Sequence, residues 1–429
     1  MTAPSSATAE GIPSCAGACG PCSGVDDVLG LRRGRLGLLL PVLVVLVVLV
    51  AAATAFAWWR TTADDVAWSA SVDGAREIDD LHRGRVLVRT DDGAAVLSAP
   101  GGTVEATLRP GPGRITAQLL TREGSAVVSL RDPVADHASV GVPAPDGGWR
   151  WHREFDEAQL VGLDPERKVA VVLDTARGLL VGMRADSGQQ VWQHPATFVP
   201  TDEPDASALV LARVSSTGRW EARALRDGTL HATSAQAFSV DGSSLVQQEG
   251  DRCGTLRIRH ETAQVEPDWG GLPVPAACSV HWLRDGYAYL TVDAGDDRRR
   301  LFALETESGR VSDLDLTLSP GALEDARESG AGRWLAVRDP GADVLRVLDA
   351  RTGRAAWSQE WSRSWAARSG PETVLTLRDD GGEQVFELRD PDGAVLGRVK
   401  SQDRQWNDSA VGDGSETAVL LDDEVVVLR

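Results

Sequence analysis

The sequence predicts an all-β fold: a β-propeller of about eight four-stranded blades, closed by strand exchange between the chain ends and preceded by one transmembrane helix. Three observations lead to this prediction. Short aliphatic runs alternate with turns along most of the chain, and glycines recur in those turns about every 40 residues. One long segment near the N-terminus carries no charge.

The uncharged segment covers residues 36–59 and is long enough to cross a bilayer core of about 30 Å as a helix. Cleaved signal peptides have a shorter apolar region, of roughly 7–15 residues, so we interpret residues 31–60 as an uncleaved signal anchor. Cleavage after the small residues 53–55 is the alternative. Arg32, Arg33 and Arg35 precede the segment, and the positive-inside rule places the N-terminus in the cytoplasm.

This anchor divides the chain into three predicted parts. Residues 1–30 form a disordered cytoplasmic tail, residues 31–60 cross the cell membrane once, and residues 61–429 form an extracytoplasmic propeller in the cell envelope. The formal net charge is −19 at pH 7, and all of it lies in the exported part, because the charges of residues 1–60 sum to +1. An acidic surface argues against a nucleic-acid partner, because phosphate binding requires a basic face.

Strand-like runs such as RVLVRT, VAVVLD and WLAVRD fill the exported part, and each is followed by a second run that ends in a polar turn. The turn glycines are Gly102, Gly147, Gly188, Gly228, Gly309, Gly353 and Gly393. The double interval before Gly309 hides a degenerate repeat near residues 265–271. The runs make eight complete strand sets and one composite set. Because propellers mostly have about four to eight blades, we predict eight and expect the irregular stretch 200–285 to hold one set too many.

Tryptophans recur with the turn glycines. Trp151, Trp192 and Trp357 each follow a turn glycine by four positions. A large ring at one fixed place in each blade can pack between adjacent sheets. We therefore interpret these tryptophans as blade-packing residues rather than as a sugar- or quinone-stacking surface.

Two segments carry a family resemblance: VLDARTGRAAW (347–357) and GMRADSGQQVW (182–192). They resemble the repeat of pyrroloquinoline-quinone-like (PQQ-like) propellers, which runs approximately Ala-Leu-Asp-Ala-x-Thr-Gly-x-x-x-Trp. Residues 303–309 match only its first half, since Asp313 stands at the tryptophan position, and residues 386–393 match more weakly. The composition, with Lys168 and Lys400 as its only lysines, is typical of a GC-rich, actinobacterial-type genome.

The resemblance implies how blades pack, and many proteins with this repeat bind no quinone. Quinoprotein dehydrogenases of this broad fold hold their cofactor between a tryptophan and a disulfide of adjacent cysteines, and bind Ca²⁺ with an asparagine. This chain has no adjacent cysteines, and its single asparagine is Asn407. We therefore predict no cofactor, PQQ included.

The two ends of the exported part predict how the ring closes. The chain ends in ETAVLLDDEVVVLR, two strands that lack the outer strand of their blade. The segment DVAWSASV (65–72) supplies a suitable outer strand, with Trp68 at the repeat tryptophan position. Pairing these segments would remove two exposed sheet edges.

The cysteines form two groups. Cys15, Cys19 and Cys22 lie in an Ala/Gly/Ser/Pro-rich segment that is typical of a disordered, reduced tail, with Zn²⁺ or cluster binding as the alternatives. Cys253 and Cys278 lie in the exported part, where an even pair is a disulfide candidate; two buried thiols are the alternative.

No catalytic motif stands out. The chain has no Gly-x-Ser-x-Gly elbow and no P-loop. Its seven histidines, at positions 82, 137, 152, 194, 231, 260 and 281, are scattered without a tight metal-binding spacing. We therefore predict no enzyme and no catalytic, cofactor-binding or metal-binding residues.

These observations favour a non-catalytic extracytoplasmic scaffold that binds an unknown envelope protein or a small ligand on one propeller face. Two alternatives stay open at this point. One is an exported quinone-dependent oxidoreductase, which rests on the family resemblance. The other is a transmembrane sensor that reports through its cysteine-rich tail.

Overall fold

The computed structural model describes residues 66–429, apart from 100, 110–112, 133, 135–136, 145–147, 201–203, 262, 330–332, 340–343, 361–363, 368–371, 381–382, 401–405 and 414–415. The predicted tail, with Cys15, Cys19 and Cys22, and the predicted anchor lie outside this part, as does Gly147. No helix within the described part is long and apolar enough to span a bilayer. Residues 64–429 form one compact unit.

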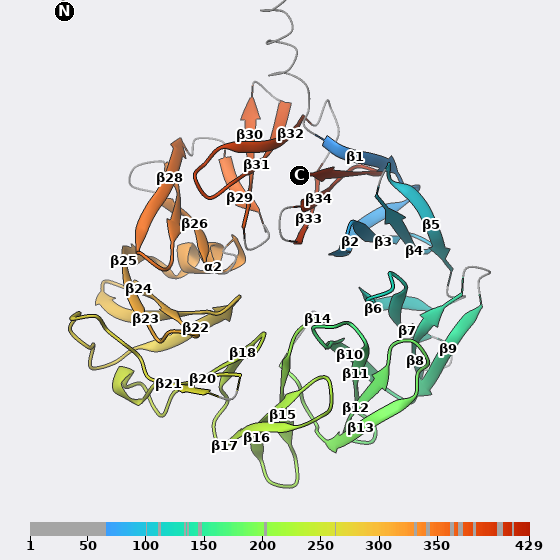
Figure 1. Cartoon of the computed structure of the whole chain (residues 1–429), viewed down its shortest axis with the longest axis horizontal. Coiled ribbons are helices and arrows are strands. Elements are labelled where there is room, and N and C mark those ends of the chain that lie inside the picture. The colour runs from blue at the N-terminus through green and yellow to red at the C-terminus, as the bar shows by residue number, and fades with distance from the viewer. Residues whose placement is uncertain are drawn as a thin grey trace, which may run out of the picture. The chain divides into compact units, whose positions relative to one another are not determined.

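The described strands form nine sheets around a ring, so the chain is an all-β β-propeller (Figure 1). We number the blades I to IX along the chain. Blade I holds β2 (Ala75–His82), β3 (Arg85–Thr90), β4 (Gly93–Ser98) and β5 (Thr103–Leu108). Blade II holds β6 (Arg114–Leu120), β7 (Ala126–Asp132), β8 (His137–Pro143) and β9 (Trp149–Phe155). Blade III holds β10 (Ala158–Leu163), β11 (Val169–Asp174), β12 (Leu179–Arg184) and β13 (Gln190–Pro195), and β14 (Asp205–Ala206) joins it as a fifth strand.

The irregular stretch contains two further blades. Blade IV has three strands: β15 (Leu209–Val214), β16 (Arg219–Ala224) and β17 (Leu230–Ser234). Blade V holds β18 (Ser239–Asp241), β19 (Ser244–Gln247), β20 (Arg257–His260) and β21 (Ala263–Val265), with the short 3-10 helix η1 (Cys253–Thr255) between β19 and β20. The hairpin β20–β21 is the degenerate repeat. Glu261, with φ +51°, occupies its turn, so no glycine marks it.

The remaining blades complete the ring. Blade VI holds β22 (Ser279–Arg284), β23 (Tyr287–Gly295), β24 (Arg298–Glu305) and β25 (Val311–Leu318). Blade VII holds β26 (Trp334–Asp339), β27 (Val344–Asp349) and β28 (Arg354–Glu360), preceded by the helix α2 (Pro320–Ser329). Blade VIII holds β29 (Ser364–Ala367), β30 (Val374–Asp380), β31 (Glu383–Arg389) and β32 (Val395–Lys400). Blade IX combines β33 (Trp406–Asp413), β34 (Glu416–Leu421) and β35 (Glu424–Leu428) with β1 (Val66–Ser71).

The predicted count of eight blades is therefore wrong: the described residues form nine. The error lies in residues 200–285, where blades IV and V are both genuine sheets although neither has a regular repeat. The prediction of four strands in each blade also fails in places. In blade VII, α2 packs against β26 through Leu323 and Ala326 and occupies the inner position that a strand takes elsewhere (Figure 1).

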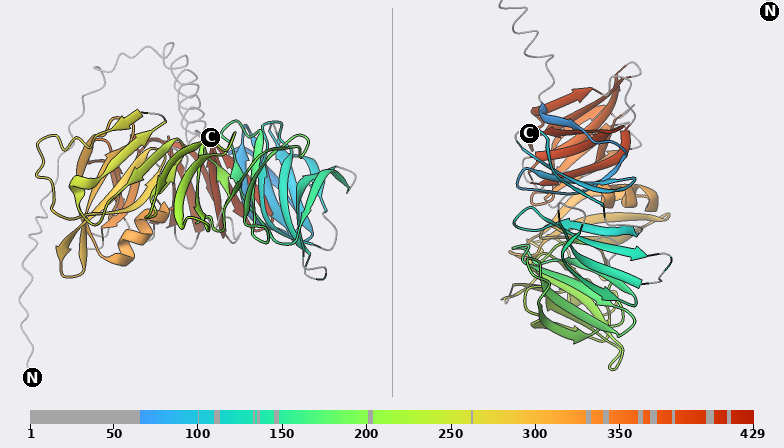
Figure 2. Two further views of the ribbon diagram at one scale, coloured as in Figure 1. Left: turned by 90° about the horizontal axis from the view of Figure 1, so that it is seen from below. Right: turned by 90° about the vertical axis from the view of Figure 1, so that its right-hand side faces the viewer.

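The core consists of layers between neighbouring blades, which stand face to face around the ring (Figure 2). One such layer joins Leu87 and Val96 of blade I to Leu120 and Val128 of blade II. Middle strands are covered on both faces, and every residue of β11 is buried. This explains why the middle strands have continuous aliphatic runs rather than an alternating pattern.

The ring closes as the chain ends predict. β1 pairs antiparallel with β35, with Trp68 opposite Val427 and Ser71 opposite Glu424. The first strand of the propeller thus becomes the outer strand of its last blade. This pairing covers the outer edge of β35, and β1 becomes the edge strand of the completed sheet.

The repeat tryptophans contact the turn glycines of the next blade. The indole N–H of Trp151 in β9 donates to Ala185 O at 2.9 Å, and a Cβ at Gly188 would lie 2.5 Å from the Trp151 ring. Trp192 repeats this arrangement with Leu225 O, at 3.0 Å, and Gly228. The same ring-on-glycine contact joins Trp68 to Gly102 and Trp357 to Gly393.

Where the repeat lacks tryptophan, backbones meet directly. Asp313 stands at the tryptophan position of blade VI, and a Cβ at Gly353 would lie 2.1 Å from Asp313 O. A Cβ at Gly309 would lie 2.2 Å from Glu266 O in the same way. The turn glycine is therefore needed for close approach both where it meets a tryptophan ring and where it meets the backbone of the preceding blade.

A disulfide joins Cys253 in η1 to Cys278 just before β22, with a Cα–Cα distance of 5.3 Å. It connects blades V and VI. The N–H of Cys278 also donates to Asp251 O at 2.7 Å. This covalent link stands where two consecutive blades lack the tryptophan contact.

We predict that Gly188→Ala lowers the free energy of unfolding by about 1–3 kcal/mol more than Gly218→Ala does. Both glycines have the left-handed φ that penalises a side chain, +68° and +65° respectively. Only Gly188 faces an indole, whereas a Cβ at Gly218 meets nothing within 4 Å. Urea and thermal unfolding of the two variants would measure the difference, and equal losses would show that the tryptophan contact adds nothing.

Candidate functional site

No strand of the described part of the chain occupies the inner position of blade IV. In the complete blades an innermost strand pairs with the second strand, but β15 has a strand neighbour only on its β16 side. The short strand β14 lies before β15 in the chain, where the innermost strand of blade IV is expected. It pairs instead in parallel with β10 of blade III, at Gly162 and Leu163 (Figure 1).

Local sequence explains why the innermost strand does not form. Phe198 pairs with Arg213 at the far end of β15, so the chain starts along the expected path. Pro200 and Pro204 follow, and proline has no N–H to donate to a strand ladder. β14 can pair with β10 of blade III only because residue 162 is glycine. A Cβ at this position would lie 2.5 Å from Asp205 O and would clash with β14.

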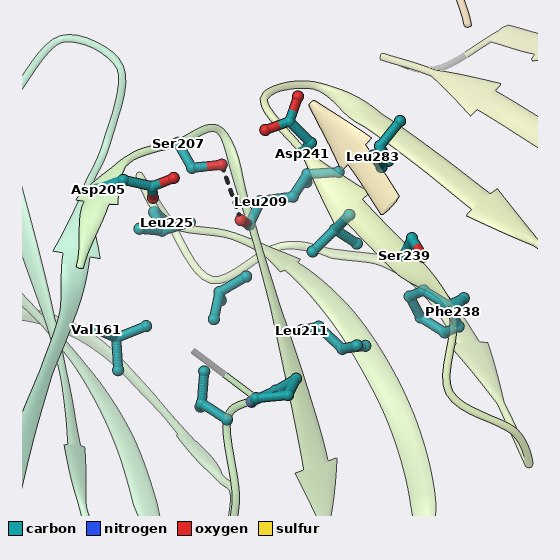
Figure 3. A pocket seen from close by; sticks show the side chains of 14 residues that line it. Val161, Asp205, Ser207, Leu209, Leu211, Leu225, Phe238, Ser239, Asp241 and Leu283 are labelled. Atoms are coloured by element: carbon teal, nitrogen blue, oxygen red, sulfur yellow. Dashed lines mark hydrogen bonds between the residues drawn. The ribbon is translucent and has the colours of Figure 1, made fainter. Parts of the chain in front are cut away.

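The empty position is a pocket of about 330 Å³ between blades III and V (Figure 3). Most of the residues that line it are apolar, but polar atoms form the larger part of its exposed wall. The lining residues are Val161, Val199, Pro200, Asp205, Ser207, Leu209, Val210, Leu211, Leu225, Phe238, Ser239, Val240, Asp241 and Leu283. They come from β10, β15, β18 and β22 and from the segments between these strands.

Three carboxylates from different blades gather at the polar end. Asp205 comes from β14, Asp241 ends β18, and Asp285 follows β22. Asp205 and Asp241 also line a second hollow of about 460 Å³, which Asp285 shares. We call these three residues the acidic edge.

Burial and mutual repulsion raise the pKa values of the acidic edge. Burial raises the pKa of Asp241 to about 7, and the charges of Asp285 and Asp205 act in the same direction. The N–H of Gly286, 3.4 Å from Asp241 Oδ2, partly offsets this rise. Burial also raises the pKa of Asp205 and of Asp285. The side chains of Asp205 and Asp285 are exposed to water, which screens their charges, whereas Asp241 is half-buried.

The nearby cations offset this charge only partly. Arg284 lowers the pKa of both Asp205 and Asp285, and Arg167 lowers that of Asp205. Arg167 already forms an ion pair with Asp80 of blade I and donates to Leu120 O of blade II at 2.8 Å. Its guanidinium therefore ties three blades together and is shared between carboxylates.

A hydrogen-bonded network forms one wall of the second hollow. The Ser244 hydroxyl lies 2.9 Å from His260 Nδ1 and 2.7 Å from Thr306 Oγ1, and the Thr306 hydroxyl donates to Gly286 O at 2.9 Å. Ser244 is 1% exposed. This hydroxyl links blades V and VI from inside the wall and is not placed to attack a bound molecule.

The residues singled out in the sequence lie elsewhere. The repeat tryptophans pack between blades, and the disulfide joins η1 to the segment just before β22. Among the histidines, His260 reaches the wall of the second hollow and His137 lines a separate one at blades II and III. No group of three or more His, Cys, Asp or Glu within the described part of the chain is arranged to hold a metal ion.

Sequence reasoning missed the pocket and the acidic edge. Each of the three aspartates stands beside a turn, where aspartate is common, and about 40 residues separate one from the next. One usable signal was present: Pro200 and Pro204, four residues apart, occupy the place where a strand is due.

Comparison with known proteins adds only distant likenesses. No family model and no curated protein matches the chain. BamB from Moraxella catarrhalis is 14% identical, with a TM-score of 0.39, over 74% of this chain and 99% of that one. The uncharacterized protein lmo1340 from Listeria monocytogenes is 11% identical, with a TM-score of 0.37, over 68% of this chain and 97% of that one.

The dihydro-heme d1 dehydrogenase NirN is 12% identical, with a TM-score of 0.36, over 76% of this chain and 72% of that one. These values are too low to carry an argument about function. The resemblance to PQQ-like repeats is compatible with the propeller fold, and membership of that family stays a prediction.

We predict that the protein loses stability as the pH rises from 5 to 8, by about 2–3 kcal/mol through Asp241. The folded protein keeps a proton on Asp241 up to a pKa of about 7, whereas the unfolded chain releases it near pH 4. Ionisation between these values therefore favours unfolding. Asp241→Asn should flatten the slope of melting temperature against pH.

Asp186→Asn is the matched control. Arg184 holds the pKa of the exposed Asp186 at about 2, so this carboxyl stays ionised in both states between pH 5 and 8. Its replacement should shift the whole curve without changing the slope. An Asp241→Asn curve parallel to that of the unsubstituted protein would refute the assignment.

Proposed function

We propose that the protein is a non-catalytic binding scaffold, displayed outside the cell by a single-pass anchor, and that it binds its partner at the incomplete blade IV. The observation that carries this proposal is the pocket of about 330 Å³ with an acidic edge on a rigid ring. Pockets of this size are common binding sites of proteins. The acidic edge favours a partner that carries positive charge, because such a charge would relieve the repulsion among the three carboxylates.

The location rests on separate observations. The uncharged segment 36–59 and the arginines before it support an anchor with an exported propeller. The disulfide between Cys253 and Cys278 also supports export, because such bonds persist in oxidising compartments and are rare in the cytosol.

We predict that cysteine labelling in cells will separate the two ends of the chain. After denaturation with a chelator present, a maleimide-polyethylene glycol should add to three of the five cysteines before reduction and to all five after it. The three are Cys15, Cys19 and Cys22. Deleting residues 36–59 should leave the propeller in the cytoplasm, so that five cysteines react without reduction. Five adducts on the intact chain would contradict export, and none would indicate cleavage of the tail.

Photocrosslinking tests the binding function. We expect p-benzoylphenylalanine in place of Ser239, which lines the pocket, to yield a discrete adduct in cells. The control carries the same group in place of Val134, which is 90% exposed and does not line the pocket. Asp241→Asn should weaken only the Ser239 adduct. Identical adduct patterns from both positions, or none from Ser239, would contradict a binding role for blade IV.

A further inference from the structure

We propose that a short extended peptide completes blade IV as its fourth strand, with apolar side chains in the pocket and a lysine or arginine at the acidic edge. This inference rests on the proposed binding function and names the class of partner. It requires hydrogen bonds between the backbone of the peptide and that of β15, which a general binding pocket does not need, and these bonds can be tested separately.

The free edge of β15 has one vacant pairing position. In an antiparallel pair, alternate residues direct their N–H and C=O to the same side. On the inner side, Leu209 donates to Gly242 O at 3.1 Å and accepts from the Ser207 hydroxyl at 3.2 Å. Arg213 donates to Phe198 O and accepts from the N–H of Thr197, both at 2.9 Å.

Leu211 lies between these two positions on the same edge. Its neighbours Val210 and Ala212 face β16, so the N–H and C=O of Leu211 point into the pocket. No hydrogen bond to either group is formed by the residues that the structure describes. Leu211 is only 6% exposed, and a buried peptide group without a partner is costly. A peptide residue opposite Leu211 would satisfy both groups.

The chain itself is poorly suited to fill this position. Continued in the antiparallel register of Phe198 with Arg213, the chain would place Pro200 opposite Leu211, and proline cannot donate a backbone hydrogen bond. The residues after Pro204 pair with β10 instead. The edge therefore stays available for an added strand, a known mode of peptide recognition.

The neighbouring blades set the direction and length of the added strand. Inner strands pair antiparallel with the second strand, as β10 does with β11 and β22 with β23. An added strand in this sense runs opposite to β15, so its C-terminal end lies beside Leu209 and Asp241. The gap between Leu209 and Arg213 spans about 13 Å, which accommodates roughly four residues.

Charge complementarity identifies the residue at that end. Asp205, Asp241 and Asp285 lie where the C-terminal part of the peptide would emerge, and Arg167 and Arg284 offset them only partly. A cationic side chain there would pair with the acidic edge. Apolar side chains would contact Val161, Leu211 and Phe238 along the pocket.

The probe is the peptide acetyl-Val-Thr-Val-Lys-amide, added to the full-length protein in detergent micelles and followed by fluorescence anisotropy of a labelled copy. Each backbone amide is N-methylated in turn. We expect one internal N-methyl group to weaken binding at least tenfold, because it removes the hydrogen bond to Leu211 O, while its neighbours are tolerated. The reversed sequence and the version with Glu in place of Lys should each bind at least tenfold more weakly.

Two variants locate the site. Val240→Trp fills the pocket and should abolish binding, whereas Val134→Trp, on an exposed site elsewhere, should not. Asp241→Asn should remove most of the preference for Lys over Glu and leave the N-methylation pattern unchanged. The N-methylation series needs no altered protein, so it stands even if a variant folds poorly.

A flat N-methylation series, binding that survives Val240→Trp, or no binding at millimolar peptide would overturn the inference. If the photocrosslinked adduct at Ser239 still forms in that case, the scaffold function stands and its partner is not an added strand. Loss of both the peptide binding and the adduct would overturn both proposals. Occupation of the pocket by a second copy of the chain, seen as a concentration-dependent dimer that excludes the peptide, would also overturn the inference.

Discussion

Antiparallel pairing between β1 and β35 joins the first and last strands of the propeller in one sheet, and the other blades depend on this closure. A blade buries its two faces only against its neighbours, so an open ring would expose two apolar sheet faces. Closure also brings the inner strands around a common centre, where residues far apart in sequence meet. The ion pair between Arg167 and Asp80 spans blades I and III in this way, through Leu120 O of blade II.

Contacts between blades divide the ring into two kinds of joint. At regular joints a tryptophan ring packs on the turn glycine of the next blade. The tryptophans of blades II and III also donate their indole N–H to a backbone carbonyl three residues before that glycine. At the joints after blades V and VI the backbone contacts the glycine directly, and the disulfide joins blades V and VI. The acidic edge lies against the disulfide-linked blades, so the least regular part of the repeat is also where chemistry gathers.

The repeat made the fold predictable, and the same regularity concealed the site. Glycine spacing and the tryptophans at 151, 192 and 357 identified the propeller, and the terminal segments identified its closure. The strand sets numbered nine, and the predicted eight followed from the usual size of propellers, because blade IV lacks a strand, blade V lacks its turn glycine, and one of them was taken for a misread set. Asp205, Asp241 and Asp285 converge only through ring geometry, and each one alone is an ordinary turn residue. The pattern predicts the positions that repeat, whereas the site consists of positions that depart from it.

Two separate costs coincide at blade IV, and this coincidence is the strongest reason to regard it as functional. Leu211 is buried and its peptide groups find no partner among the residues that the structure describes, and the acidic edge holds carboxylates whose ionised forms repel one another. Either cost alone could be removed by a single substitution, such as a residue with an N–H at Pro200 or an amide at Asp241. An extended peptide with a cationic side chain would remove both costs at once. Its backbone would pair with the N–H and C=O of Leu211, and its cationic side chain would pair with the acidic edge. In blade VII the helix α2 takes the inner position, whereas no element in the described part of the chain takes it in blade IV, which is why we propose that another molecule binds there.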